Sequence, residues 1–208
     1  MECVKFMKIL KALLTTWSPE KPLCKIPKSC CPNCTTLAFD FDEIKDSFCK
    51  KLAMSPLNSA DSIYLDEQRN TIYFLEMKDL QKYRQHQRQH DLTEQQFIEK
   101  FFTDKQLSLA NKAIDSYVLI LAIVGYYAEK FSGEEEFSSK LSIFSYLLNN
   151  HKLQVKYFVI VNMSYIDYVT YEISNLSMSY DKFRFLKEVN IIRADDIDNF
   201  IQISHSTD

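Results

Sequence analysis

The longest apolar run of the sequence covers 12 residues, from Tyr117 to Ala128. A helix that crosses a membrane needs about 20 such residues, so this run predicts a helix buried in the core of a soluble protein. A second segment, Val155 to Met163, is almost continuously apolar, which is typical of a strand at the centre of a sheet covered on both faces. The two segments therefore predict a long helix packed against a sheet.

Hydrophobic periodicity assigns the rest of the chain to helices and strands. Helical spacing is found at residues 2–16, 39–53, 101–131, 137–148 and 165–186, and strand patterns at 62–65, 71–77, 155–163 and 189–192, with a last helical turn near Asp195. Residues 79–100 are polar and predict an exposed loop or the start of a solvated helix. This order of elements predicts an α/β fold with a mixed sheet flanked by helices.

The segment 18–37 contains four of the five prolines and four of the six cysteines, so we expect it to be irregular. We therefore divide the chain into an N-terminal helix with a Cys-rich arm, residues 1–37, and an α/β domain, residues 38–208. With 46% hydrophobic and 13% aromatic residues, a chain of 208 residues can bury a substantial core.

Glycine is scarce, with 2 residues in the whole chain. Dinucleotide-binding and P-loop folds need glycine where the backbone approaches phosphate, so the composition argues against these classes of nucleotide-binding protein. The net charge of −3 is compatible with nucleic-acid binding only if basic residues gather locally. The N-terminal segment lacks the continuous apolar stretch of a signal peptide. We therefore expect a soluble, cytoplasmic protein with no membrane partner.

Two strand patterns separated by a short polar loop predict a β-hairpin. Pairing Asp66 with Thr71 across the loop and following the register back puts Asp61 opposite Glu76. Directly opposed Cβ atoms lie about 5 Å apart, where two carboxylates repel each other unless a cation lies between them. Glu76 and Lys78 project from the same face of their strand. These three residue types at one point predict a site that binds Mg²⁺ or Mn²⁺ and holds or polarises a water molecule.

A simpler interpretation of the same residues is a solvated strand end. Asp61 would then end a loop, and Glu76 and Lys78 would form an ordinary group of surface charges. The context favours a catalytic site over a solvated strand end. The strand that ends in Glu-x-Lys is aliphatic and aromatic, and it has an amphipathic helix before the hairpin and a long helix after it.

The stretch from Ser59 to Asp66, followed by Thr71 to Lys78, resembles the core of the PD-(D/E)xK, or restriction-endonuclease-like, nuclease superfamily. The resemblance implies an αβββαβ core with helices flanking a mixed sheet, over roughly residues 39–163. Ala60 stands where the motif has proline, a position that varies in the family. The motif does not identify a subfamily.

The resemblance implies three metal ligands, namely Asp61, Glu76 and the main-chain carbonyl of Met77. It also implies that Lys78 is catalytic and assists the attacking water. Many members of the superfamily add an acid from the preceding helix, and we expect Glu43, in preference to Asp46, to take that role. The implied reaction is the metal-dependent hydrolysis of phosphodiester bonds of nucleic acid. We expect DNA more than RNA as the substrate, but the sequence leaves the choice between them open.

Basic residues alternate with Gln and Tyr just beyond Lys78, and they include Lys82, Arg84 and Arg88. Such side chains would contact a phosphate backbone, although the same pattern is typical of an ordinary solvated segment. Nucleic acid is the expected partner. Whether the chain forms a homodimer or binds a partner protein is left open by the sequence.

Four cysteines are clustered within eleven residues: Cys24, Cys30, Cys31 and Cys34. Thiolates at this spacing can share one tetrahedral Zn²⁺. A four-cysteine iron–sulfur cluster is a second interpretation, and reduced structural cysteines in a loop are a third.

Three functional hypotheses follow from these patterns. The first is an active metal-dependent nuclease. The second is a catalytically idle nuclease-fold subunit of a nucleic-acid-processing complex, and the third is a zinc-stabilised interaction module. The presence of all three hairpin residues, Asp61, Glu76 and Lys78, favours the first, because decay of an active site usually removes one of them.

Overall fold

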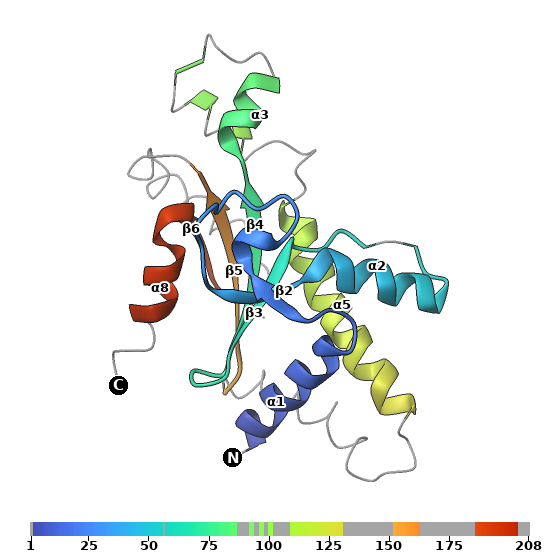
Figure 1. Cartoon of the computed structure of the whole chain (residues 1–208). Coiled ribbons are helices and arrows are strands. Elements are labelled where there is room, and N and C mark those ends of the chain that lie inside the picture. Colours follow the sequence, from blue (N-terminus) through green and yellow to red (C-terminus); the bar gives the residue numbers. More distant parts are fainter. Residues whose placement is uncertain are drawn as a thin grey trace.

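The computed structural model describes residues 2–55, 57–86, 92–93, 96–97, 100–101, 109–130, 152–162 and 186–203. These residues form one open, mixed sheet with the strand order β1-β2-β3-β4-β5-β6 (Figure 1). Strands β1 to β4 are antiparallel neighbours, whereas β4, β5 and β6 are parallel. The strands are β1 (Glu20–Pro22), β2 (Leu37–Asp40), β3 (Ser62–Asp66), β4 (Thr71–Lys78), β5 (Gln154–Val161) and β6 (Leu186–Arg193).

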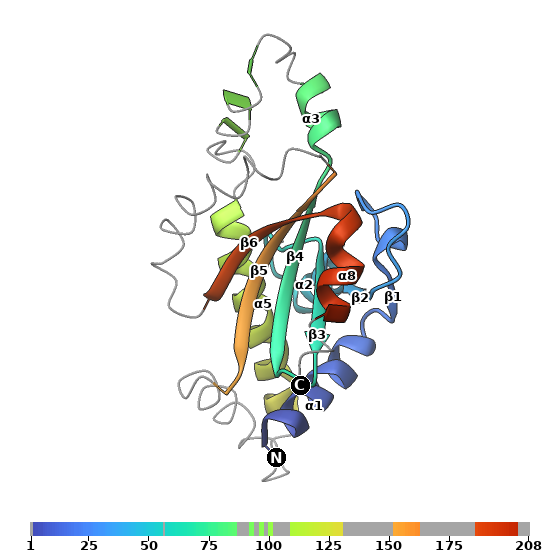
Figure 2. The same ribbon diagram turned by 90° about the vertical axis from the view of Figure 1, so that its left-hand side faces the viewer.

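Helices cover both faces of this sheet. They are α1 (Glu2–Thr15), α2 (Phe41–Leu52), α3 (Leu80–His86), α5 (Leu109–Lys130) and α8 (Ile197–Ile203), with short 3₁₀ helices at η1 (Leu23–Lys25) and η2 (Ala194–Asp196). The two ribbon views show α8 on one face of the sheet and α5 on the opposite face (Figures 1 and 2). The predicted α/β fold with a mixed sheet flanked by helices is therefore confirmed.

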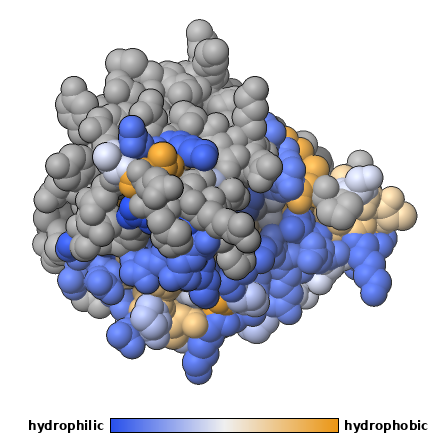
Figure 3. All heavy atoms as spheres, turned by 90° about the horizontal axis from the view of Figure 1, so that it is seen from above, coloured by the Kyte–Doolittle hydropathy of each residue, from blue (hydrophilic) through white to orange (hydrophobic). Residues whose placement is uncertain are grey.

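The sheet separates two clusters of buried apolar side chains. The larger cluster lies against α1, α2 and α5 and includes Leu10, Phe48 and Ile120. The smaller cluster lies on the other face, where the loop before β2 and helix α8 contribute side chains such as Cys31 and Ile197. Seen from above, most of the surface coloured by hydropathy is hydrophilic, with separate hydrophobic areas (Figure 3).

Helix α5 and strand β5 meet in the larger cluster, as predicted. Ile120 is 1% exposed and Val159 is 2% exposed. The expectation that the helix is buried on every side is wrong, because Val118 is 42% exposed. One face of α5 packs on the sheet, so only that face needs to be fully apolar. Among the described residues, no helix has the length and hydropathy needed to span a membrane.

The β3–β4 hairpin has the predicted register. Asp66 pairs with Thr71, and Ser62 pairs with Leu75. Oδ1 of Asp66 accepts two main-chain N–H groups of the turn, and Asn70 adopts a φ of 53°, in the left-handed region that Asn tolerates. The helices predicted at 2–16 and 39–53 are confirmed by α1 and α2, and the turn predicted near Asp195 by η2 and α8.

Other boundaries differ from the prediction. β1 lies in the segment expected to be irregular, and β2 begins at its last residue, Leu37. β1 is a short edge strand, where a proline such as Pro22 is tolerated. The domain boundary predicted after residue 37 falls inside β2, so the arm contributes a strand to the same sheet. β6 begins at Leu186, the last residue of an expected helix. The rest of that helix, and the helix expected at 137–148, lie outside the described residues.

Candidate metal-dependent active site

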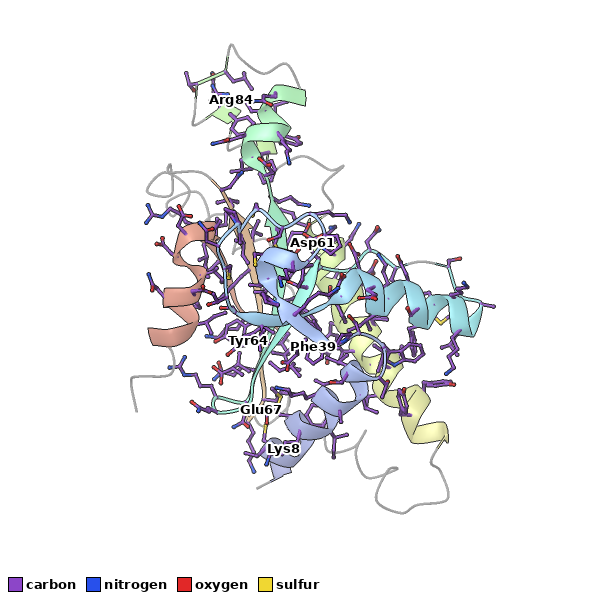
Figure 4. All side chains as sticks on the ribbon, in the orientation of Figure 1. Lys8, Phe39, Asp61, Tyr64, Glu67 and Arg84 are labelled. Atoms are coloured by element: carbon purple, nitrogen blue, oxygen red, sulfur yellow. The ribbon has the colours of Figure 1, made fainter. Side chains whose placement is uncertain are left out.

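Asp61 and Glu76 meet at one end of the hairpin. The pairing of Ser62 with Leu75 places Asp61, one residue before β3, opposite Glu76 in β4, as predicted. Asp61 is 2% exposed and Glu76 is 0% exposed. Asp61 lies toward the end of the sheet from which α3 projects, whereas Glu67 marks the turn at the opposite end of the hairpin (Figure 4).

Three elements hold Asp61 in place. Its Oδ2 accepts the N–H of Met77 over 2.7 Å, and its main-chain oxygen accepts the N–H of Phe41, at the start of α2, over 3.1 Å. The preceding residue, Ala60, donates its N–H to Oγ of Ser116 on α5 over 2.8 Å. The Asp61 carboxylate is therefore positioned jointly by β4, α2 and α5, which is the rigid support that a chemical site needs.

Two lysines contact Glu76. Lys78, two residues along β4, forms an ion pair with Oε1 of Glu76. Nζ of Lys112, on α5, lies 2.6 Å from the same oxygen and 3.7 Å from Oδ1 of Asp61. Lys112 was missed in the sequence analysis, where the only signal was a basic residue near the start of a helix with a long apolar run.

The four side chains form a buried group of compensating charges. Burial raises the pKa of Glu76, and the charge of Asp61 raises it further, while Lys78 and Lys112 act in the opposite direction. Burial would lower the pKa of Lys112, but the carboxylates of Glu76 and Asp61 raise it above its ordinary value. Lys112 is therefore a stable ammonium group at neutral pH.

One oxygen of each carboxylate accepts no hydrogen bond from the described residues: Oδ1 of Asp61 and Oε2 of Glu76. Buried polar atoms are normally satisfied, and unpaired carboxylate oxygens are ligands that hard divalent cations prefer. In the part of the chain that the structure describes, no three His, Cys, Asp or Glu side chains form a metal-binding group. A cation held by these two acids would need main-chain or water oxygens as well.

The main-chain carbonyl of Met77 is suited to that role. The N–H and C=O of one residue in an extended strand point to the same side, and the N–H of Met77 points to Asp61. The Met77 carbonyl is therefore directed to the Asp61 side of β4. The Met77 side chain is buried on the other face of the sheet, in the smaller apolar cluster.

Glu43, the acid expected from the preceding helix, contacts other groups. Its Oε2 accepts hydrogen bonds from Oγ of Ser18 over 2.7 Å and from Nζ of Lys21 over 3.1 Å, and its side chain is 48% exposed. Asp46, the less favoured choice, is still more exposed and pairs with Lys45. The structure does not bring either carboxylate to Asp61 and Glu76.

Asp42 is the α2 acid that contacts the segment leading to Asp61. Its carboxylate accepts a hydrogen bond from Ser59 and forms ion pairs with Lys28 and Lys45. Burial would raise the pKa of Asp42, but these two lysines lower it. The ionised Asp42 in turn contributes to the raised pKa of Lys112. Sequence analysis had not singled out Asp42.

The residues expected to bind nucleic acid follow the site along the chain. Lys82, on α3, is exposed and its Nζ lies 3.2 Å from Oδ2 of Asp79. Arg84 donates to the main-chain oxygen of Leu92 over 3.0 Å, so it is partly engaged within the protein. It projects beyond the end of the sheet at which Asp61 lies (Figure 4). Arg88 lies outside the described residues.

The four clustered cysteines are free thiols: Cys24, Cys30, Cys31 and Cys34. Sγ of Cys30 donates to the carbonyl of Ile160 over 3.4 Å, and Sγ of Cys34 donates to Oδ1 of Asp198 over 2.9 Å. Three of the four are buried against the sheet, on the face opposite Glu76. The zinc or iron–sulfur site stays a prediction, which elemental analysis of the purified protein tests.

Comparisons of the chain with protein-family models, with curated proteins and with solved structures find no match. Function therefore has to be inferred from the geometry of the site itself.

Proposed function

We propose that this protein is a divalent-metal-dependent nuclease that hydrolyses phosphodiester bonds of nucleic acid, and that DNA is the first substrate class to test. The observation that carries the proposal is the buried pair of carboxylates, Asp61 and Glu76, each with one oxygen that accepts no hydrogen bond from the described residues and with Lys78 beside them. Two acids buried side by side destabilise a fold unless they are paired with cations. Clusters of this kind are typical of functional sites.

The order of the elements supports a restriction-endonuclease-like core. The described elements run α1-β1-β2-α2-β3-β4-α3-α5-β5, so the order αβββαβ is obtained from α1, β2, β3, β4, α5 and β5 when β1, α2 and α3 are treated as additions to the core. In this core, three antiparallel strands are followed by a helix and by a strand parallel to the third. We propose on this basis that the chain is a diverged member of the PD-(D/E)xK superfamily.

The proposed ligands of Mg²⁺ or Mn²⁺ are Asp61, Glu76 and the carbonyl of Met77. When bound, such a cation polarises the scissile phosphate and makes a coordinated water more acidic. The hydrogen bond from the N–H of Met77 fixes Oδ2 of Asp61 and leaves Oδ1 without a hydrogen bond from the described residues. Lys78 holds an ammonium group beside Glu76, where it orients a water molecule and stabilises negative charge that develops on phosphate.

Exposed lysines flank this site and suit a polyanionic substrate. Lys82 lies on α3, directly beyond the strand that carries Glu76. Lys28 is 67% exposed, and the charges of Asp61 and Glu76 help to raise its pKa after the dominant effect of Asp42. Contacts of such lysines with phosphates release counterions, so we expect nucleic-acid binding to weaken as the salt concentration rises.

The test is cleavage of end-labelled DNA and RNA, single and double stranded, in Mg²⁺, in Mn²⁺ and in EDTA. We expect metal-dependent cleavage by the wild type and its loss in Asp61→Asn and Glu76→Gln. Glu67→Gln is the matched control, because it removes an acid at the opposite end of the same hairpin. Cleavage that persists in EDTA or in Glu76→Gln would contradict the proposal.

A catalytically idle nuclease-fold subunit is the second candidate, and one observation favours it. The ammonium group of Lys112 contacts both carboxylates, as a bound cation would. An idle subunit would bind nucleic acid without cleaving any member of the panel and would show no affinity for Mn²⁺. The zinc-stabilised interaction module has no comparable support among the described residues.

A further inference from the structure

The helix that carries Lys112 is fixed relative to the two acids. It lies near the start of α5, and the same helix anchors the segment that leads to Asp61 through two side chains. Oδ2 of Asp115 accepts the N–H of Asn58 over 2.9 Å, and Oγ of Ser116 accepts the N–H of Ala60 over 2.8 Å. The contact of Lys112 with both carboxylates is therefore part of the docking of α5 on the sheet.

The charges of the site are already balanced without a metal ion. The carboxylates of Asp61 and Glu76 face the ammonium groups of Lys78 and Lys112, and both lysine side chains are 19% exposed. A divalent cation placed between the carboxylates would lie within a few ångströms of Lys112, where like charges repel strongly in a weakly screened environment. The metal and Lys112 therefore need the same two carboxylates, and both need Oδ1 of Asp61.

We propose that Lys112 competes with the divalent metal ion for Asp61 and Glu76. When the metal displaces Lys112, its ammonium group pairs with a phosphate of the nucleic acid. This inference rests on the proposed function and adds a control on metal loading. Lys112 is the lysine that moves, because it contacts both acids from a separate element through a flexible four-carbon side chain. Lys78 shares its strand with Glu76 and contacts that acid alone.

Displacement of Lys112 couples the binding of metal to the binding of substrate. Without phosphate, the displaced ammonium group loses its partners, which opposes metal binding. With a phosphodiester present, the ammonium group gains a new partner, so each ligand strengthens the binding of the other. The protein would therefore take up its metal mainly together with nucleic acid.

The first experiment measures the Kd for Mn²⁺ by electron paramagnetic resonance, without nucleic acid, for wild type and Lys112→Met. We expect the variant to bind Mn²⁺ at least about tenfold more tightly. Lys112→Arg keeps the charge and should stay close to wild type. Lys50→Met is the matched control, since it removes an exposed lysine in the last turn of α2. Circular dichroism monitors the fold, and equal or weaker binding by a folded Lys112→Met overturns the inference.

The second experiment uses the wild type and does not depend on whether a variant folds. Acetic anhydride modifies accessible lysines, and peptide mass spectrometry measures the rate at each position. We expect saturating Mn²⁺ to increase the acetylation rate of Lys112 and to leave that of Lys50 unchanged. If Mn²⁺ binds but Lys112 becomes no more reactive, the competition is refuted while the nuclease proposal stands. If neither wild type nor Lys112→Met binds Mn²⁺, the proposed function itself fails.

Discussion

The main-chain N–H of Met77 lies 2.7 Å from Oδ2 of Asp61, so the strand that carries Glu76 also orients the other acid of the site. Asp61 consequently has two roles. It accepts a hydrogen bond from the main chain of β4, and it places a negative charge beside the ammonium group of Lys112. The two roles are separable by substitution, because an amide retains an acceptor oxygen while losing the charge.

We predict that Asp61→Asn abolishes Mn²⁺ binding and changes the free energy of unfolding little. Asp61→Ala should abolish binding too, but it leaves the buried N–H of Met77 without its acceptor, which costs about 1 to 3 kcal/mol. Urea denaturation of both variants and of the wild type measures this difference. Equal stability of the Asn and Ala variants would show that the hydrogen bond does not hold the site together.

The second prediction concerns Lys78. Its side chain lies at the end of β4 and contacts Glu76, which keeps Lys112 as a partner when Lys78 is removed. Lys78→Ala should therefore fold normally, yet cleave between about 100-fold and 10,000-fold more slowly, the usual range for loss of a group that assists proton transfer. Single-turnover cleavage rates and thermal melting curves test both parts. A wild-type rate in this variant would remove Lys78 from the mechanism.

Asp42 and Glu43 offer a comparison between adjacent residues. The charge of Asp42 acts on Lys112, whereas Glu43 is bound to Ser18 and Lys21. Asp42→Asn should lower kcat/KM by about tenfold, equivalent to about 1.4 kcal/mol of transition-state stabilisation. Glu43→Gln should leave kcat/KM near the wild-type value. The reverse ranking would mean that Glu43 supplies the helix acid after all.

The surroundings of Asp198 predict that the free energy of unfolding depends on pH. Burial would raise its pKa, but hydrogen bonds from Cys34 and from Thr35 and Thr36 lower it well below its usual range. A carboxyl whose pKa is lower in the folded state stabilises the protein above the ordinary Asp pKa of about 3.9, and this stabilisation is lost as the pH falls through the lower folded value.

Asp198→Ala should therefore reduce the free energy of unfolding by about 1 to 2 kcal/mol at pH 7. The difference from wild type should persist at pH 5 and shrink in strong acid. Urea denaturation across this pH range provides the measurement. A difference that does not change with pH would show that packing of the side chain, and not its charge, ties α8 to the loop before β2.

The contrast between Asp61 and Lys112 shows how far the sequence predicts the site. The position of Asp61 opposite Glu76 could be predicted because the turn length fixes the hairpin register and each strand has a period of two. Lys112 lies 36 residues from Glu76 in the sequence. Its contact depends on where α5 docks, and no local pattern encodes that choice.

The same distinction separates Asp42 from Glu43 and accounts for β1. Periodicity predicted the α2 helix, but which of two neighbouring acids faces the sheet depends on how Phe41 and Phe48 pack against it. β1 is three residues long and pairs with β2 at the sheet edge. A strand of that length has no hydrophobic periodicity of its own, and it forms because it pairs with β2.

The last prediction tests the architecture through paired substitutions to Asp. Val159 is 2% exposed in β5, in the cluster that also contains Ile120 of α5. Val159→Asp would bury a charge without a partner, with a cost on the order of 5 kcal/mol, which is comparable to the whole stability of many domains. We therefore expect no cooperative thermal transition and insoluble expression. Val118→Asp makes the same change at a 42% exposed position of α5 and should melt within a few degrees of wild type. A soluble, cooperatively folded Val159→Asp would mean that β5 is not covered on the α5 face, and the arrangement that brings Lys112 to Glu76 would have to be abandoned.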